Sequence, residues 1–85
     1  MNWEKLKVYR KVAKAGSFLK ASKQDNKSQS TFSRAVMDLE REINRKLFNR
    51  TSKGVMPTLH GSTLLNLVDD FSNKLNQFLN NNRKN

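Results

Sequence analysis

The segment from Ser28 to Arg50 constrains the fold of this chain more than any other part of the sequence. Ser28 is a good helix N-cap, because its hydroxyl can accept a hydrogen bond from a free backbone amide of the first helical turn. Apolar residues then recur at steps of four, three and four, as one buried helix face requires. These residues are Phe32, Val36, Leu39 and Ile43. Asn44 tolerates left-handed backbone geometry, so the segment predicts a helix over residues 28–43 that ends there.

A short hairpin is predicted directly after this helix. Lys46–Arg50 and Val55–Pro57 read as two extended segments, and the polar residues 51–54 between them read as a four-residue turn containing glycine. Proline has no backbone N–H to donate, so Pro57 fits only at a strand end.

Two more helices are predicted before residue 28. In the first, over about Trp3–Ala15, apolar residues form one stripe. They are Trp3, Leu6, Tyr9, Val12 and Ala13. Gly16 suits a left-handed C-terminal position and Ser17 can cap the second helix, which starts at Phe18. The apolar pattern of this second helix fails after Ser22.

A fourth helix is predicted from Thr58, its N-cap, to roughly Leu79. Its apolar residues alternate steps of four and three, which is a heptad pattern. They are Leu64, Val68, Phe71, Leu75 and Phe78. This apolar stripe could cover the core of its own domain or pair with another helix. A helix of some 30 Å, at 1.5 Å per residue, is longer than the small domain that it leaves, which favours a dimer contact.

The chain therefore divides into a small domain (1–58), a dimerisation helix (59–82) and a frayed tail (83–85). The net charge of +10 is concentrated in the first part, where fourteen Lys and Arg stand against five Asp and Glu. Residues 59–85 carry three basic residues against two acidic ones. Concentrated positive charge favours a polyanion as partner, because binding releases counterions. Charge alone leaves DNA, RNA and a membrane surface open.

Composition excludes several function classes. There is no cysteine and only one histidine, His60, so the sequence offers no thiolate, no disulfide and no metal site. Clustered carboxylates and a glycine-rich phosphate loop are also missing, so neither an enzyme nor a cofactor is predicted. No apolar run is long enough for a membrane span or a signal peptide, which predicts a cytoplasmic protein.

The ordered set of residues resembles the N-terminal DNA-binding domain of LysR-type bacterial transcriptional regulators, together with its linker helix. The matching positions are Leu6, Val12, Ala13, Gly16-Ser17-Phe18, Ala21, Ser28-Gln29, Ser33-Arg34, Leu39-Glu40, Leu47-Phe48, Arg50, Gly54-Val55, Thr58 and Gly61. The resemblance implies a mainly α fold, a winged helix-turn-helix of three helices and a short β-hairpin wing, followed by a long C-terminal dimerisation helix.

The resemblance also implies sequence-specific binding of double-stranded DNA in transcriptional regulation, with helix 28–43 in the major groove and wing 50–55 on the backbone or in the minor groove. The implied base-reading residues are Gln29, Ser30, Ser33 and Arg34. Ser28 and Thr31 are expected to hold phosphates, and the implied wing contacts are Arg50 and Lys53, on the backbone or in the minor groove. The chemistry agrees, since Gln can pair with adenine and Arg can grip guanine through two parallel hydrogen bonds.

Two departures from the family pattern stand in the second helix, where Asp25 and Lys27 replace apolar residues. An unpaired buried carboxylate is destabilising, so Asp25 must turn outward or the helix must pack loosely. We expect a domain less stable than its relatives.

Family members normally continue into an effector-binding domain, and no effector pocket is evident in this chain. A complete short protein, an excised domain and a gene remnant all remain open. As an alternative to a homodimeric DNA reader, the chain could form mixed dimers with a full-length relative and modulate it. RNA binding is disfavoured, because the aromatic residues lie on apolar stripes.

Overall fold

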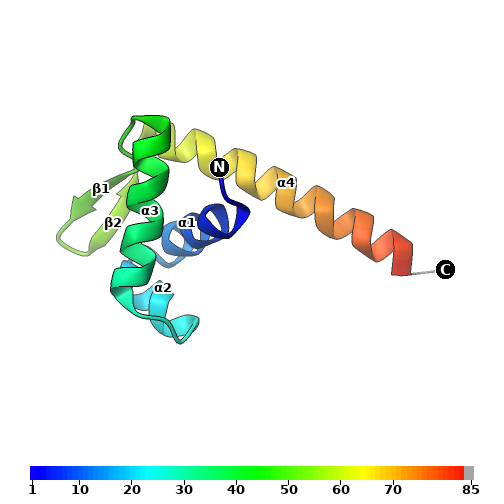
Figure 1. The fold of residues 1–85 in the computed structure, drawn as a ribbon, viewed down its shortest axis with the longest axis horizontal. Helices are drawn as coiled ribbons and strands as arrows, with labels where there is room; N and C mark the ends of the chain where they lie inside the picture. The colour runs from blue at the N-terminus through cyan, green and yellow to red at the C-terminus, as the bar shows by residue number, and fades with distance from the viewer. Residues whose placement is uncertain (84–85) are drawn as a thin grey trace.

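The computed structural model describes residues 1–83, which form four helices and a two-stranded hairpin (Figure 1). The elements are α1 (Trp3–Ala15), α2 (Phe18–Gln24), α3 (Gln29–Ile43), β1 (Phe48–Thr51), β2 (Gly54–Pro57) and α4 (Leu59–Arg83). This order confirms the predicted fold, a winged helix-turn-helix followed by a long C-terminal helix.

The helix ends follow from the residues that the sequence singled out. The hydroxyl of Ser17 accepts a hydrogen bond from the backbone N–H of Lys20 at 3.2 Å and caps α2. Gly16 and Asn44 adopt left-handed backbone geometry, with φ of 75° and 59°, and end α1 and α3. Both residue types tolerate this geometry, so these boundaries were predictable.

The turn of the hairpin is shorter than predicted. Thr51 pairs with Gly54, so the turn holds only Ser52 and Lys53 instead of four residues. Lys46 lies outside the strands, because its carbonyl oxygen accepts a hydrogen bond from the hydroxyl of Thr58 at 2.6 Å. The first strand therefore starts two residues later and ends one residue later than the predicted Lys46–Arg50.

The turn end of strand β2 is attached to the turn between α1 and α2. The backbone N–H of Val55 donates to the carbonyl oxygen of Gly16 at 2.9 Å. A Cβ added to Gly54, whose φ is 140°, would lie 2.1 Å from the same oxygen. An isolated two-stranded hairpin is marginally stable in water, so this attachment holds the wing on the domain.

The core lies between α1, α2, α3 and the hairpin. Its buried hydrophobic residues are Tyr9, Val12, Phe18, Ala21, Phe32, Val36, Leu39, Leu47, Phe48 and Val55. The ring of Phe48 packs against the tilted ring of Tyr9 and meets that of Phe18 edge to face, with centroids 4.8 Å and 5.8 Å away. Burial of each large side chain stabilises the fold by about 1.5–3 kcal/mol, so this cluster joins the wing to the helices.

Helix α2 accommodates Asp25 at its C-terminal end. Asp25 is half-buried, and its carboxylate forms an ion pair with Lys11 of α1. Lys27 is exposed. The carboxylate is therefore neither unpaired nor fully buried. The reason for expecting a less stable domain, an unpaired charge in the core, does not apply at Asp25 or at Lys27.

Helix α4 starts on the domain and then leaves it (Figure 1). The hydroxyl of Thr58 accepts a hydrogen bond from the N–H of Gly61 at 3.1 Å, as an N-cap does. The helix packs against α1 and continues to Arg83, which the sequence had assigned to the tail. Residues 84 and 85, the rest of the predicted tail, lie outside the described residues.

Candidate functional site

The N-terminal turn of α3 presents a group of exposed polar residues. Ser28, Gln29, Ser30 and Thr31 are all exposed. The hydroxyl of Ser28 accepts the backbone N–H of Thr31 at 3.1 Å and lies 2.6 Å from the Thr31 hydroxyl. The free N–H groups and the dipole of a helix N-terminus favour an anion, so this turn suits a phosphate.

The next turn of α3 continues the same surface. Ser33 is half-buried, Arg34 is exposed, and Met37 follows one turn later with 52% of its surface exposed. We call the outward side of Gln29, Ser30, Ser33, Arg34 and Met37 the reading face. The apolar residues of α3 point to the opposite side, into the core.

The acidic residues of α3 are held by partners. Asp38 pairs with Lys5 at 3.1 Å and with Arg41 at 3.0 Å. The hydrogen bond from Lys5 is the main cause that lowers the pKa of the Asp38 carboxyl. Glu40 accepts a hydrogen bond from the backbone N–H of Leu47 at 2.8 Å. Glu40 therefore ties α3 to the start of the wing.

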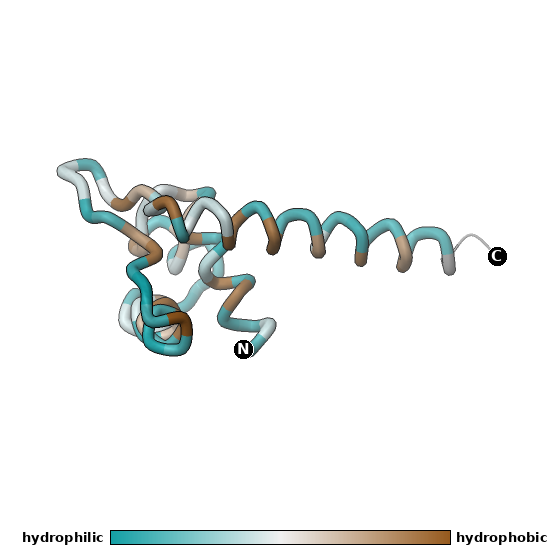
Figure 2. Tube along the Cα trace, turned by 90° about the horizontal axis from the view of Figure 1, so that it is seen from above, coloured by the Kyte–Doolittle hydropathy of each residue, from teal (hydrophilic) through white to brown (hydrophobic). Residues whose placement is uncertain are grey.

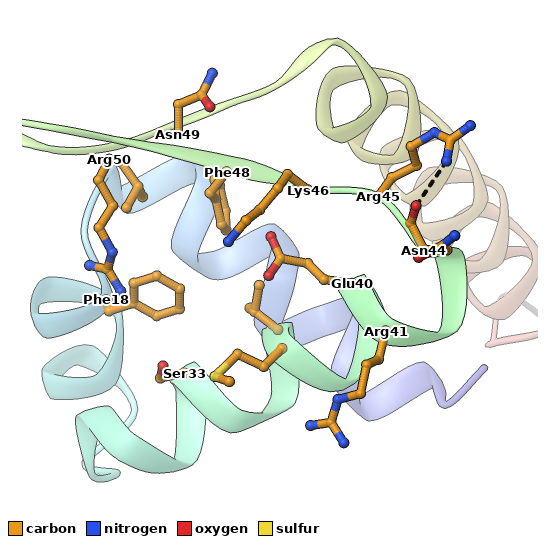
Figure 3. Close-up of a pocket in the computed structure, with 13 residues that line it drawn as sticks. Phe18, Ser33, Glu40, Arg41, Asn44, Arg45, Lys46, Phe48, Asn49 and Arg50 are labelled. Carbon is orange, nitrogen blue, oxygen red and sulfur yellow. Dashed lines mark hydrogen bonds between the residues drawn. The ribbon is translucent and has the colours of Figure 1, made fainter.

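The wing places its two predicted residues differently. Lys53 is exposed in the two-residue turn. Arg50 lies on β1, and its guanidinium carbon is 5.9 Å from the centre of the Phe18 ring. Figure 3 shows the Arg50 side chain directed toward Phe18 rather than away from the domain. A cation over an aromatic face is weakly attracted to it, which orients Arg50 toward Phe18 of α2.

A groove of about 730 Å³ lies between the reading face and the wing (Figure 3). Ser33, Met37 and Arg41 of α3 line one side, and Asn49 and Arg50 of β1 line the other. Sequence reasoning did not select Met37 or Asn49 as site residues. The signal for Met37 was an apolar residue on the polar face of α3, and the signal for Asn49 was its place next to Arg50.

The five heptad residues of α4, which we call the α4 seam, are of two kinds. Val68 is 3% exposed, and Leu64 is half-buried against the core of its own domain. Phe71 and Phe78 are 53% and 60% exposed, and Leu75 is half-buried. Figure 2 shows hydrophobic residues recurring along one edge of α4. The beginning of the seam therefore covers the domain itself, while its later residues offer an apolar surface.

Other kinds of site find little support in residues 1–83. No three His, Asp or Glu side chains of this range come together as metal ligands. None of its helices is both long enough and apolar enough to cross a membrane.

Comparison with known sequences gives a result that agrees with the winged helix-turn-helix fold. The profile of the family described as bacterial regulatory helix-turn-helix protein, lysR family, matches residues 3–62. The HTH-type transcriptional regulator YofA of Bacillus subtilis (strain 168) is 38% identical over 72 residues. That alignment covers 85% of this chain but 25% of YofA. This chain spans about a quarter of the length of the curated relatives that it matches.

Solved structures extend the match over nearly the whole chain. The DBD of CbnR in its complex with DNA superimposes with a TM-score of 0.86 at 25% identity, covering 99% of this chain and 97% of that one. The full-length LTTR LysG of Corynebacterium glutamicum with bound effector Arg gives a TM-score of 0.90 at 25% identity, and the match covers 99% of this chain and 29% of LysG. With its winged helix-turn-helix and the profile match over residues 3–62, the chain belongs to the LysR family of bacterial regulatory helix-turn-helix proteins.

Proposed function

We propose that this chain binds double-stranded DNA in a sequence-specific manner and acts in transcriptional regulation. The observation that carries the proposal is the match to the DNA-bound CbnR domain over 97% of that domain. The named relatives YofA and CbnR are transcriptional regulators, so we infer that this chain acts by binding and not by catalysis. Such a protein works on the bacterial chromosome, and the proposal therefore places it in the cytoplasm.

In this proposal α3 lies in the major groove with its N-terminal turns at the bases. Gln29, Ser30, Ser33 and Arg34 read base edges, since all four lie on the reading face and are at least partly exposed. Each good two-bond contact discriminates its base by about 1–3 kcal/mol. Ser28 and Thr31 hold phosphates with the helix N-terminus, because their hydroxyls already lie at that turn.

The wing follows the neighbouring sugar-phosphate strand. Lys53 at the tip of the hairpin reaches the backbone or the minor groove, and Arg50 faces the groove that separates the wing from α3. Contacts of this kind position the protein without reading sequence.

The active form in the proposal is a homodimer that pairs through α4. Phe71, Leu75 and Phe78 supply its contact, because they recur at steps of four and three along α4 and are at least partly exposed. Two reading heads would then bind half-sites one helical turn, about 34–36 Å, or a multiple of it apart. The α4 seam could serve a homodimer or a mixed dimer. The mixed-dimer alternative is not favoured, because the matched CbnR structure is a DNA complex.

Selection of bound sequences from a random duplex pool tests the proposal, with affinities then measured at two salt concentrations. We expect enrichment of a two-fold symmetric motif at helical-turn spacing. Equal affinity for all sequences, lost as salt is raised, would leave only a basic polyanion binder and contradict the proposal.

A further inference from the structure

Helix α1 connects the reading helix with the dimerisation helix. On one side Lys5 of α1 pairs with Asp38 of α3 at 3.1 Å. On another side α1 packs against α4, where the ring of Trp3 meets that of Phe71 edge to face with centroids 5.1 Å apart. The orientation of α4 relative to α3 is thus transmitted through the contacts that α1 makes with each.

Asp69 makes the charged contact between α4 and α1. One carboxylate oxygen accepts a hydrogen bond from Nε of Arg10, and the other accepts one from Nζ of Lys14 at 3.1 Å. Arg10 and Lys14 lie one helical turn apart on α1, so the two bonds fix both the position and the rotation of α4 along α1. The Asp69 side chain is 26% exposed, which shields the contact from part of the solvent screening.

The charged form of Asp69 is the stable one in this environment. The hydrogen bond from Arg10 is the main cause that lowers the pKa of its carboxyl, and Lys14 adds to the effect. The contact is therefore fully charged at neutral pH.

The next residue along α4 provides an internal comparison. Asp70 pairs with Lys74 of the same helix at 3.2 Å, and its side chain is 64% exposed. Asp69 and Asp70 thus carry the same charge, but Asp69 joins α4 to α1 and Asp70 makes its ion pair within α4.

We propose that Asp69 is a positioning residue that, through Arg10 and Lys14, sets the distance between half-sites that the dimer accepts. The inference rests on the proposed function. In a dimer joined through α4, any rotation of α4 on α1 swings the two reading helices relative to each other. A rotation of about 10° moves a point about 20 Å away by roughly 3.5 Å, which is close to the rise of one base pair. A contact that fixes this angle therefore selects the spacing.

The test compares Asp69→Asn with Asp70→Asn, which remove the same charge from adjacent positions. Each variant and the unchanged protein are bound to duplexes that carry the selected motif at its preferred spacing, with one or two base pairs added or removed, and to a duplex with a single half-site. We expect Asp69→Asn to bind the single half-site as the unchanged protein does, while its preference for the best spacing over its neighbours falls at least about threefold. Asp70→Asn should keep the full preference.

The outcomes distinguish a failure of the positioning role of Asp69 from a failure of the proposed DNA-binding function. If the unchanged protein prefers one spacing and Asp69→Asn prefers it equally, the positioning role is wrong. If the unchanged protein selects no spaced motif, the proposed function fails first. If Asp69→Asn melts below the assay temperature, Lys14→Gln takes its place, because it removes one of the two bonds and leaves Arg10. That variant must then show a weakened preference at unchanged half-site affinity, and an undiminished preference overturns the inference.

Discussion

Gly61 lies so close to Leu47 that a Cβ added to Gly61 would be 2.1 Å from the Leu47 carbonyl oxygen. The same Cβ would be 2.5 Å from the hydroxyl oxygen of Tyr9. Glycine is required here because backbone and a buried ring meet the helix at its first turn. The close approach lets α4 begin directly on the core and fixes where it leaves the domain.

Gly61→Ala should therefore destabilise the protein, by about 1–3 kcal/mol, because the extra methyl group forces a backbone shift. Chemical denaturation followed by circular dichroism measures the change in the free energy of unfolding. Ser62→Ala, at the exposed neighbouring position, is the control and should stay within about 0.5 kcal/mol. Equal stability of Gly61→Ala and the unchanged protein would show that the helix start can shift at no cost.

Arg34→Ala and Lys53→Ala should differ in how they alter DNA binding. Loss of Arg34 should reduce affinity for the selected motif by about 1–3 kcal/mol and relax preference at one base position, because a base contact is lost. Loss of Lys53 should weaken binding to all DNA sequences alike. It should also reduce the slope of log affinity against log salt concentration by about 1, because a phosphate contact is lost. Titrations of motif and random duplexes at several salt concentrations distinguish the two. Equal losses on motif and random DNA for Arg34→Ala would refute its reading role.

Lysine substitutions along the α4 seam should have two separate effects. Phe78→Lys should abolish dimerisation without lowering the melting temperature, because Phe78 is exposed and far along the helix. Val68→Lys should unfold the domain, because it buries a charge at a position that is 3% exposed. Analytical ultracentrifugation and thermal melts measure the two properties side by side. A dimer that persists in Phe78→Lys would place the contact elsewhere.

Tyr9 should titrate far above an ordinary tyrosine. Burial, with a smaller contribution from the charge of Glu40, raises its pKa from 10.0 to about 12. The tyrosine ionises at a lower pH in the unfolded chain than in the folded protein. The stability that Tyr9 confers is therefore complete below pH about 10 and is lost as the pH rises from about 10 to about 12. Tyr9 is the only tyrosine, so phenolate absorbance reports it alone. A midpoint near 10 in the folded protein would contradict its burial.

Replacing Asp25 or Lys27 by an apolar residue should bring no gain in stability. Asp25→Leu loses the ion pair with Lys11, a contribution of at most about 1 kcal/mol at a partly exposed site. Lys27→Val exposes an apolar side chain at a position that is already in solvent. Thermal melts of both variants check this, and a higher midpoint for either would restore the view that these residues weaken the domain.

Local signals in the sequence were enough to predict most of the fold. Ser17, Ser28, Asn44 and Thr58 mark helix ends because capping depends on neighbouring residues only. The start of strand β1 was predicted two residues too early, because it depends on a residue distant in the sequence. Lys46 leaves the strand because Thr58, twelve residues later, binds its carbonyl oxygen. A pattern of residue types does not report such a contact.

The candidate site divides in the same way. Periodicity placed Gln29, Ser33 and Arg34 on the outer side of α3, where the structure leaves them at least partly exposed. Periodicity did not predict that Asp69 bonds to Arg10 across 59 residues of chain, nor that the α4 seam starts inside its own domain. Both depend on the angle at which α4 crosses α1, which only the packed structure defines.

The edge-to-face contact between Trp3 and Phe71 has a practical consequence. Trp3 is the only tryptophan of the chain, and it stands where α1 meets α4. Its fluorescence therefore gives the protein an intrinsic optical probe of this junction, with no label attached. A change of emission when DNA is added, in the presence and absence of Asp69→Asn, would follow the movement of α4 in solution and in real time.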